Sequence, residues 1–361
     1  MSYYNHFSKL DNDQPYGLLA AEKQRLLVAF LNELTAHHVQ KSALYAKIVA
    51  SLALPPVARR VEDLPFIPVR LFKHLDLLSV PRGEVFKTLT SSGTSGQAVS
   101  RIYLDRENVA MQSRVLGSIV SSFLGKQRMP MVVVDADNLL ANRHQFNARA
   151  AGVIGFSVFG KEHAYALDAH MALKMETLEA YCEKHRARGI YLFGFTFVVW
   201  KFLCQALVSR DSRLNFGAGG ILIHGGGWKK LNEESVSNEV FKAMLLERVG
   251  LHHVHNYYGM VEQTGSIYME CEYGHLHTSN YADVIVRDPI SFKPAAVGEQ
   301  GLLQVISLLP CSYPGHSLLT EDVGVVLGED DCPCGRMGKY FKVHGRLKSA
   351  EVRGCSDVRK F

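Results

Sequence analysis

The sequence contains no hydrophobic run long enough to cross a membrane. The longest run, Ile190 to Trp200, is followed by Lys201 and has about half the length that a bilayer requires. The N-terminal segment is polar and lacks the apolar core of a signal peptide. We therefore expect a cytoplasmic protein without a membrane span.

Several other features are also missing. The net charge is only +5 over 361 residues and no nucleic-acid-binding motif is present, so we expect no nucleic-acid partner. We find no internal repeat and no low-complexity tract. The seven cysteines occur without a secretion signal, which favours free thiols or metal ligands over a disulfide framework. The composition, 47% hydrophobic and 21% charged, is that of a globular chain with one large or two medium domains.

The order of predicted elements indicates an α/β fold. Apolar residues at helical spacing predict helices within 18–52, and from residue 85 onward predicted strands alternate with predicted helices. This alternation favours α/β layers with a largely parallel central sheet. The expected strands are 85–90, 131–134, 152–159, 219–223 and 253–258, and the expected helices are 105–122, 166–188, 195–209 and 233–248. We predict four parts: a helical segment over 1–80, an α/β core over 81–265, a β-rich subdomain over 266–342, and a short motif with a tail over 343–361.

A run of hydroxylated residues and glycines lies between two predicted strands. Glycines let the backbone approach a polyphosphate closely, and the hydroxyl groups supply further donors without bulk. No lysine follows the run, so it differs from the helix-capping P-loop of common NTPases. A flexible loop without a ligand is the alternative. The run consists of Thr90, Ser91, Ser92, Gly93, Thr94, Ser95 and Gly96.

Four shorter motifs follow this run along the chain. The first is His224–Trp228, which contains Gly225, Gly226 and Gly227, and the second is Asn256–Glu262, which contains Tyr258 and Gly259. The third is Leu319–Gly324, which contains Asp322, and the fourth is Gly345–Lys348, which contains Arg346. Their order resembles that of the adenylate-forming superfamily, which includes acyl- and aryl-CoA ligases. The resemblance implies the N-terminal domain of such an enzyme, with layered α/β sheets and a small β-rich subdomain. It also implies that the usual mobile C-terminal domain is lacking.

The resemblance implies ATP and Mg²⁺ as cofactors and assigns roles to individual residues. Tyr258 lies near adenine, beside the glycine turn, and Glu262 helps to hold Mg²⁺. Asp322 contacts the ribose hydroxyls, Arg346 reaches the nucleotide, and Lys348 lies at the hinge pivot. Two positions depart from the family pattern, with Val261 in place of threonine and Glu321 in place of glycine.

Within the superfamily, the chain is similar over nearly its whole length to the LuxE-type acyl-protein synthetases. The shared segments are TSSGTSG, HGGGWK, NYYGMVEQTG and the terminal EVRGCSD. This resemblance implies that a long-chain fatty acid is activated as acyl-AMP, transferred to Cys355 and passed to an acyl reductase that makes an aldehyde. An acyl transferase or thioesterase is a further candidate partner. The cations Lys348, Arg353, Arg359 and Lys360 around Cys355 favour its thiolate, which is a good acyl acceptor.

Two other functions are compatible with the motifs. One is a phenylacetate-type acyl- or aryl-CoA ligase that uses a free thiol as acceptor. The other is a non-catalytic subunit that binds a reductase, and the departures at Val261 and Glu321 are its only support.

A separate set of residues suggests a structural zinc site. Cys332 and Cys334 form a Cys-x-Cys pair, and Cys271 with His277 could complete a tetrahedral set of three thiolates and one imidazole. Such a set has no open position and would be structural. Unliganded thiols in turns are the alternative.

Overall fold

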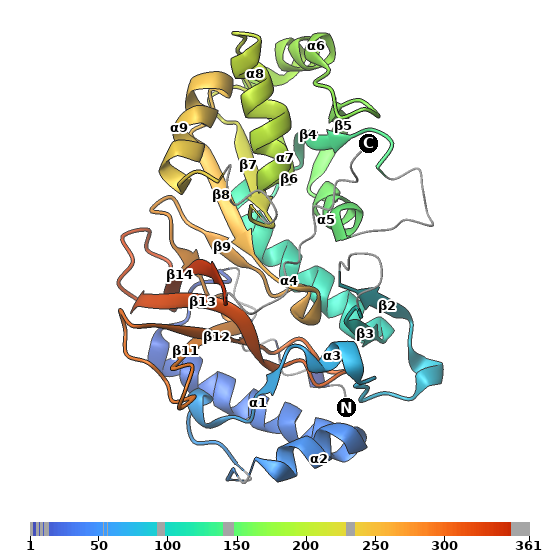
Figure 1. Ribbon diagram of the computed structural model, residues 1–361, viewed down its shortest axis with the longest axis vertical. Helices are drawn as coiled ribbons and strands as arrows, with labels where there is room; N and C mark the ends of the chain where they lie inside the picture. The colour runs from blue at the N-terminus through green and yellow to red at the C-terminus, as the bar shows by residue number, and fades with distance from the viewer. Residues whose placement is uncertain are drawn as a thin grey trace. The chain divides into compact units, whose positions relative to one another are not determined.

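A computed structural model describes residues 3–4, 7, 10, 14–52, 54–55, 57–91, 98–139, 148–228 and 235–347. None of the helices in this described part is long and apolar enough to cross a membrane. The chain divides into two compact units (Figure 1). Among the described residues, the first unit contains those up to 91 together with 98–122 and 259–347, and the second contains 123–139, 148–228 and 235–258.

The second unit is built on a parallel sheet, as the alternation of elements predicts. Its strands follow the order β8-β7-β6-β4-β5, and each neighbouring pair is parallel. All of β6 and nearly all of β4 are buried, as in sheets that helices cover on both faces. The strands are β4 (Met129–Ala136), β5 (Gly160–Leu167), β6 (Tyr191–Phe195), β7 (Ile221–Gly225) and β8 (His253–Tyr258). The helices are α5 (Ala148–Ser157), α6 (Met175–His185), α7 (Thr196–Val198), α8 (Gln205–Ser209) and α9 (Asn238–Val249), with a π-helical turn at Val199–Cys204 between α7 and α8.

One expected strand of this unit is wrong. Residues 152–157 belong to α5, in which Val153 and Phe156 are buried while Ile154 is 45% exposed, a helical pattern of burial. The β-branched and aromatic residues favoured a strand, but Gly152 lets the helix pack tightly on β6. A Cβ atom on Gly152 would lie 2.9 Å from Cζ of Phe195. The helix expected over 166–188 is also too long, because β5 runs to Leu167 and α6 begins only at Met175.

The first unit is built on an antiparallel sheet. Its strands follow the order β11-β12-β13-β14-β10-β9, with β1 parallel to β13, and β2 and β3 form a separate hairpin. The strands are β1 (Ile67–Pro68), β2 (Lys87–Thr90), β3 (Arg101–Leu104), β9 (Tyr268–Glu270), β10 (Leu276–His277), β11 (Ala282–Arg287), β12 (Gln300–Ser307), β13 (Ser317–Glu329) and β14 (Lys339–Arg346). The helices are α1 (Ala20–Lys41), α2 (Ala43–Ser51), α3 (Leu71–His74) and α4 (Arg106–Leu124), of which α4 belongs to this unit up to Ser122.

The helices predicted within residues 18–52 are present as α1 and α2, and α1 packs on the antiparallel sheet (Figure 1). The ammonium group of Lys23 donates to the Thr278 carbonyl at 3.1 Å. At the other end of α1, Nε2 of His38 lies 3.1 Å from the carbonyl oxygen of Pro310. These buried polar contacts fix the helix on the unit that contains β9 to β14.

Candidate functional site

The hairpin β2–β3 leads into and out of the predicted phosphate loop. Thr90 ends β2 and pairs with Arg101 across the hairpin. Beyond this pair, the backbone N–H of Ser100 donates to the Ser91 hydroxyl at 2.9 Å. Thr90 and Ser91 therefore lie where the hairpin opens. The predicted loop residues Ser92, Gly93, Thr94, Ser95 and Gly96 lie outside the described residues.

Three predicted site residues from separate segments lie in the first unit. Glu262 lies in a 3₁₀ turn, Val261–Gln263, whereas Asp322 is in β13 and Arg346 ends β14. Asp322 and Arg346 are directly opposite each other in the sheet, and Nε of Arg346 donates to Oδ1 of Asp322 at 3.0 Å. Lys348 lies outside the described residues.

The electrostatic surroundings of Glu262 link it to this pair. Burial raises the pKa of Glu262, a hydrogen bond with the Ser100 side chain and the charge of Arg346 lower it, and the charge of Asp322 raises it. The side chain is almost fully buried, with 7% of the residue exposed. A buried carboxylate with a raised pKa is stabilised in its charged form by a nearby positive charge, so this position suits an interaction with a cation. The sequence motifs did not indicate Ser100, whose only signal is its place opposite Ser91 across the hairpin.

Glu321, one of the two residues that depart from the family pattern, has an ion-pair partner in the structure. Its carboxylate forms an ion pair with Nε of Arg70, which precedes α3. Its backbone carbonyl accepts a hydrogen bond from the N–H of Leu347 at 3.0 Å. Glu321 therefore ties β13 to two neighbouring segments.

In the second unit, the predicted glycine turn follows β7. Gly225 is opposite Tyr257 of β8, and a Cβ atom on Gly225 would lie 2.5 Å from Cε1 of that ring. Gly226 and Gly227 have φ angles of +85° and +59°, which L-amino-acid side chains rarely tolerate. Tyr258 ends β8, and Gly259 is the first residue after it. The turn thus depends on glycine both for its backbone angles and for its contact with Tyr257, to which the sequence motifs assign no role.

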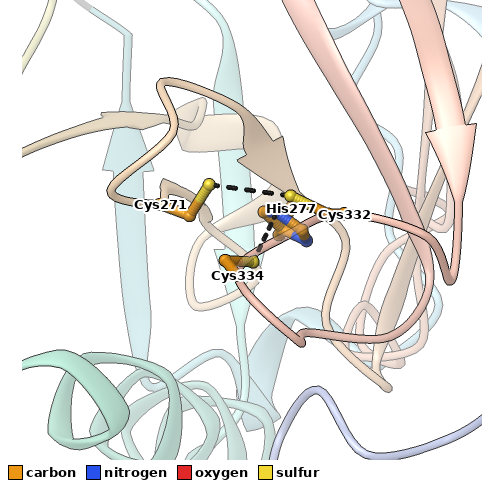
Figure 2. Close-up of side chains that lie close together, drawn as sticks. All are labelled: Cys271, His277, Cys332 and Cys334. Atoms are coloured by element: carbon orange, nitrogen blue, oxygen red, sulfur yellow. Dashed lines mark hydrogen bonds between the residues drawn. The ribbon is translucent and has the colours of Figure 1, made fainter.

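The Cys and His residues predicted as zinc ligands converge in the first unit. Their ligand atoms, from Cys271, His277, Cys332 and Cys334, all lie within 4.8 Å of one another. Cys271, His277 and Cys332 are buried, and Cys334 is half-buried. Figure 2 shows the four side chains pointing toward a common centre. Burial lowers the pKa of His277 to about 4, so its imidazole is neutral and can act as a ligand at physiological pH.

Solved structures define the class of this fold. The open conformation of 2-hydroxyisobutyryl-CoA ligase, solved with 2-HIB-AMP and CoA, matches with a TM-score of 0.71 and 16% identity, covering 94% of this chain and 79% of that one. The same ligase in the postadenylation state, with R3-HIB-AMP, matches with a TM-score of 0.70 and 16% identity, covering 93% and 71%. At this identity the likeness concerns the fold alone, which is that of adenylate-forming enzymes.

Sequence relatives define the family. A family model described as acyl-protein synthetase, LuxE, matches residues 8–360. The long-chain-fatty-acid–luciferin-component ligase of Vibrio harveyi is 25% identical over 348 residues, covering 93% of this chain and 87% of the relative. The ligase of the same name from Aliivibrio fischeri is 23% identical over 343 residues, covering 93% and 88%. The chain belongs to the LuxE acyl-protein synthetase family, and it is a ligase.

Proposed function

We propose that this ligase uses ATP to activate a long-chain fatty acid as acyl-AMP and then transfers the acyl group to its own Cys355. The thioester delivers the acyl group to an acyl reductase that makes the aldehyde. The names of the two relatives, both long-chain-fatty-acid–luciferin-component ligases, support the fatty-acid substrate. The principal support from the structure is the hydrogen-bonded pair of Asp322 and Arg346, electrostatically linked to the buried Glu262.

In the first half-reaction, a carboxylate oxygen of the fatty acid attacks the α-phosphorus of ATP. The bond between the α-phosphorus and the bridging oxygen breaks, and pyrophosphate leaves. Because two anions must meet, the barrier is largely electrostatic, and positive charge with N–H donors lowers it. Arg346 supplies positive charge at the nucleotide, and Asp322 accepts hydrogen bonds from the ribose hydroxyls. We assign the phosphates to the loop Thr90–Gly96, and the adenine side to the turn Gly225–Gly227 with Tyr258 and Gly259.

Glu262 is a suitable ligand for Mg²⁺. Its carboxylate is a hard oxygen donor, and its burial leaves the negative charge poorly solvated unless a cation is near. A bound Mg²⁺ would offset the negative charge of the phosphates.

In the second half-reaction, the thiolate of Cys355 attacks the carbonyl carbon of acyl-AMP. A C–S bond forms, the bond from the acyl carbon to the phosphate oxygen breaks, and AMP leaves, while the thiol proton goes to solvent. The thioester keeps the acyl group reactive for the next acceptor. Cys355 lies outside the described residues, and the support for its role is the basic sequence around it and the family resemblance. We assign Lys348 to the hinge that precedes this tail.

Labelling with radioactive fatty acid tests this proposal. The protein is incubated with the labelled acid, Mg²⁺ and ATP, with and without CoA, and wild type is compared with Cys355→Ser. We expect hydroxylamine-labile label on wild type, no such label on Cys355→Ser, and pyrophosphate release from both. Cys311→Ser, which alters a half-buried cysteine of the first unit, is the matched control and should be labelled like wild type.

The other outcomes each contradict a specific part of the proposal. Equal labelling of wild type and Cys355→Ser would rule out this cysteine as acceptor. Soluble acyl-CoA without labelled protein would indicate a phenylacetate-type CoA ligase instead. Absence of pyrophosphate release from wild type would refute fatty-acid adenylation.

A further inference from the structure

We propose that Cys271, His277, Cys332 and Cys334 bind one structural Zn²⁺, which ties the turn before β10 to the turn before β14. This site goes beyond the proposed function, because neither fatty-acid activation nor acyl transfer to Cys355 uses these four side chains. The two turns are far apart in sequence, since 61 positions separate Cys271 from Cys332.

The distances agree with a tetrahedral site. Zn–S bonds of about 2.3 Å and Zn–N bonds of about 2.0–2.1 Å place neighbouring ligand atoms roughly 3.5–3.8 Å apart. The sulfur atoms of Cys271 and Cys332 lie 4.0 Å apart, and Sγ of Cys334 lies 3.4 Å from Nε2 of His277 (Figure 2). A disulfide between the first pair would need a separation of about 2.05 Å. The spacing therefore suits a shared ion better than a covalent link, and three thiolates with one imidazole suit zinc.

The backbone of the two turns follows the same design. The carbonyl of Cys271 accepts a hydrogen bond from Gly274, and the carbonyl of Cys332 accepts one from Gly335, each at 3.0 Å. Both glycines are left-handed, with φ angles of +79° and +76°. In the second turn, the N–H of Arg336 also donates to Sγ of Cys334 at 3.5 Å. Such turns direct N–H groups toward an anionic centre, which stabilises thiolate ligands.

Two aromatic rings orient the imidazole ligand. The ring of Tyr340 stacks on that of His277 at 5.7 Å, and the ring of Tyr16 meets it edge-on at 6.2 Å. His275 is also near, with Nδ1 3.4 Å from Sγ of Cys332. We assign His277 as the ligand because it is fully buried and its Nε2 lies 3.4 Å from Sγ of Cys334. One of its ring nitrogens lies within 4.8 Å of all three sulfur atoms.

The ion would stabilise the sheet that positions Arg346. His277 pairs with Tyr340 across β10 and β14, so both metal-binding turns adjoin the pairing that sets the register of β14. Four protein ligands leave no open position for a substrate, which makes the site structural. Cys334 borders an open hollow of about 280 Å³, lined in part by Tyr16, Glu272 and Arg336, through which an ion or a chelator can enter.

The test measures metal in the untagged full-length protein. We expect about one zinc per chain by elemental analysis of wild type. After removal of zinc with a chelator and addition of Co²⁺, we expect the visible d–d bands and the near-ultraviolet thiolate charge-transfer band of a tetrahedral cobalt–thiolate site. These readings on wild type test the proposal even where a variant does not fold. Wild type that contains less than about a tenth of an equivalent of zinc, and that shows no tetrahedral cobalt spectrum, overturns it.

Matched variants test the ligand set. Cys332→Ser and Cys334→Ser should bind zinc at least tenfold more weakly than wild type. Cys182→Ser, a buried cysteine outside the cluster, and Cys355→Ser should keep full metal content, which separates this proposal from the acyl-acceptor role of Cys355. His277→Ala should lose metal and His275→Ala should retain it, and the reverse result would overturn the assignment of His277.

Discussion

Nε of Arg346 donates a hydrogen bond to Oδ1 of Asp322 at 3.0 Å, across the neighbouring strands β14 and β13. The two residues come from different motifs, yet the register of the antiparallel sheet places them opposite each other. The contact orients the guanidinium group. In the proposed reaction, this orientation directs its positive charge to the nucleotide.

Substitution of either residue of this pair should impair adenylation. A hydrogen bond to a charged group contributes about 1.5–3 kcal/mol, so Asp322→Asn and Arg346→Lys should each lower kcat/KM for ATP-dependent pyrophosphate release by about 10- to 150-fold. Because 41% of the Arg346 side chain is exposed, the thermal midpoint of Arg346→Lys should change little. Unaltered pyrophosphate release in both variants would show that the pair does not contact ATP.

The ion pair of Glu321 with Arg70 should matter little for either stability or activity. The Arg70 side chain is about half exposed, and such pairs contribute about 0–1 kcal/mol. We expect Glu321→Gln, Arg70→Gln and the double variant to lose no more than this in urea denaturation, and to keep adenylation. Loss of pyrophosphate release in Glu321→Gln alone would instead reveal a direct role for this carboxylate in catalysis.

Glu262→Gln should change the pH dependence of stability and should also lower the rate of adenylation. Burial raises the pKa of Glu262 in the folded protein, so the folded state binds this proton more tightly than the unfolded chain. Stability must therefore fall as the pH rises from about 4.5, where glutamate in the unfolded chain ionises, through the folded-state pKa. The amide variant lacks this loss.

We accordingly expect the difference in thermal midpoint between Glu262→Gln and wild type to become more positive as the pH increases through that interval. Adenylation by the variant should fall by about 100-fold, because the proposed carboxylate ligand of the Mg²⁺ that would offset phosphate charge has been removed. A difference in thermal midpoint that is independent of pH would contradict the raised pKa of Glu262 in the folded protein.

Two glycines of α5 should respond in opposite ways to alanine. Gly152→Ala should destabilise the protein by about 1–3 kcal/mol, because its Cβ atom would lie 2.9 Å from the buried ring of Phe195. Gly155→Ala, where no atom lies within 4 Å of the new Cβ, should stabilise it by about 0.5–1 kcal/mol through helix propensity. Urea denaturation of the two variants measures both effects, and equal destabilisation would argue against helix α5 at these positions.

Local patterns in the sequence were sufficient for much of the fold. Alternating strand and helix signals predicted the parallel sheet of the second unit, and β8 has the predicted bounds, 253–258. The prediction was wrong at 152–157, where valine, isoleucine and phenylalanine have a high strand propensity. The contact between Gly152 and Phe195 decides the outcome there, and no local pattern reveals a contact between residues 43 positions apart.

By itself, the sequence determined which kinds of chemical group are present and in what order, and this was enough for the family and for the candidate ligands Cys271, His277, Cys332 and Cys334. Only the tertiary structure decided which of these groups lie close together. It brought the four ligands to within 4.8 Å and gave Glu321 a partner in Arg70. The physical reason is that motifs and periodicity are local, whereas the register of β10, β13 and β14 depends on the packing of the whole sheet.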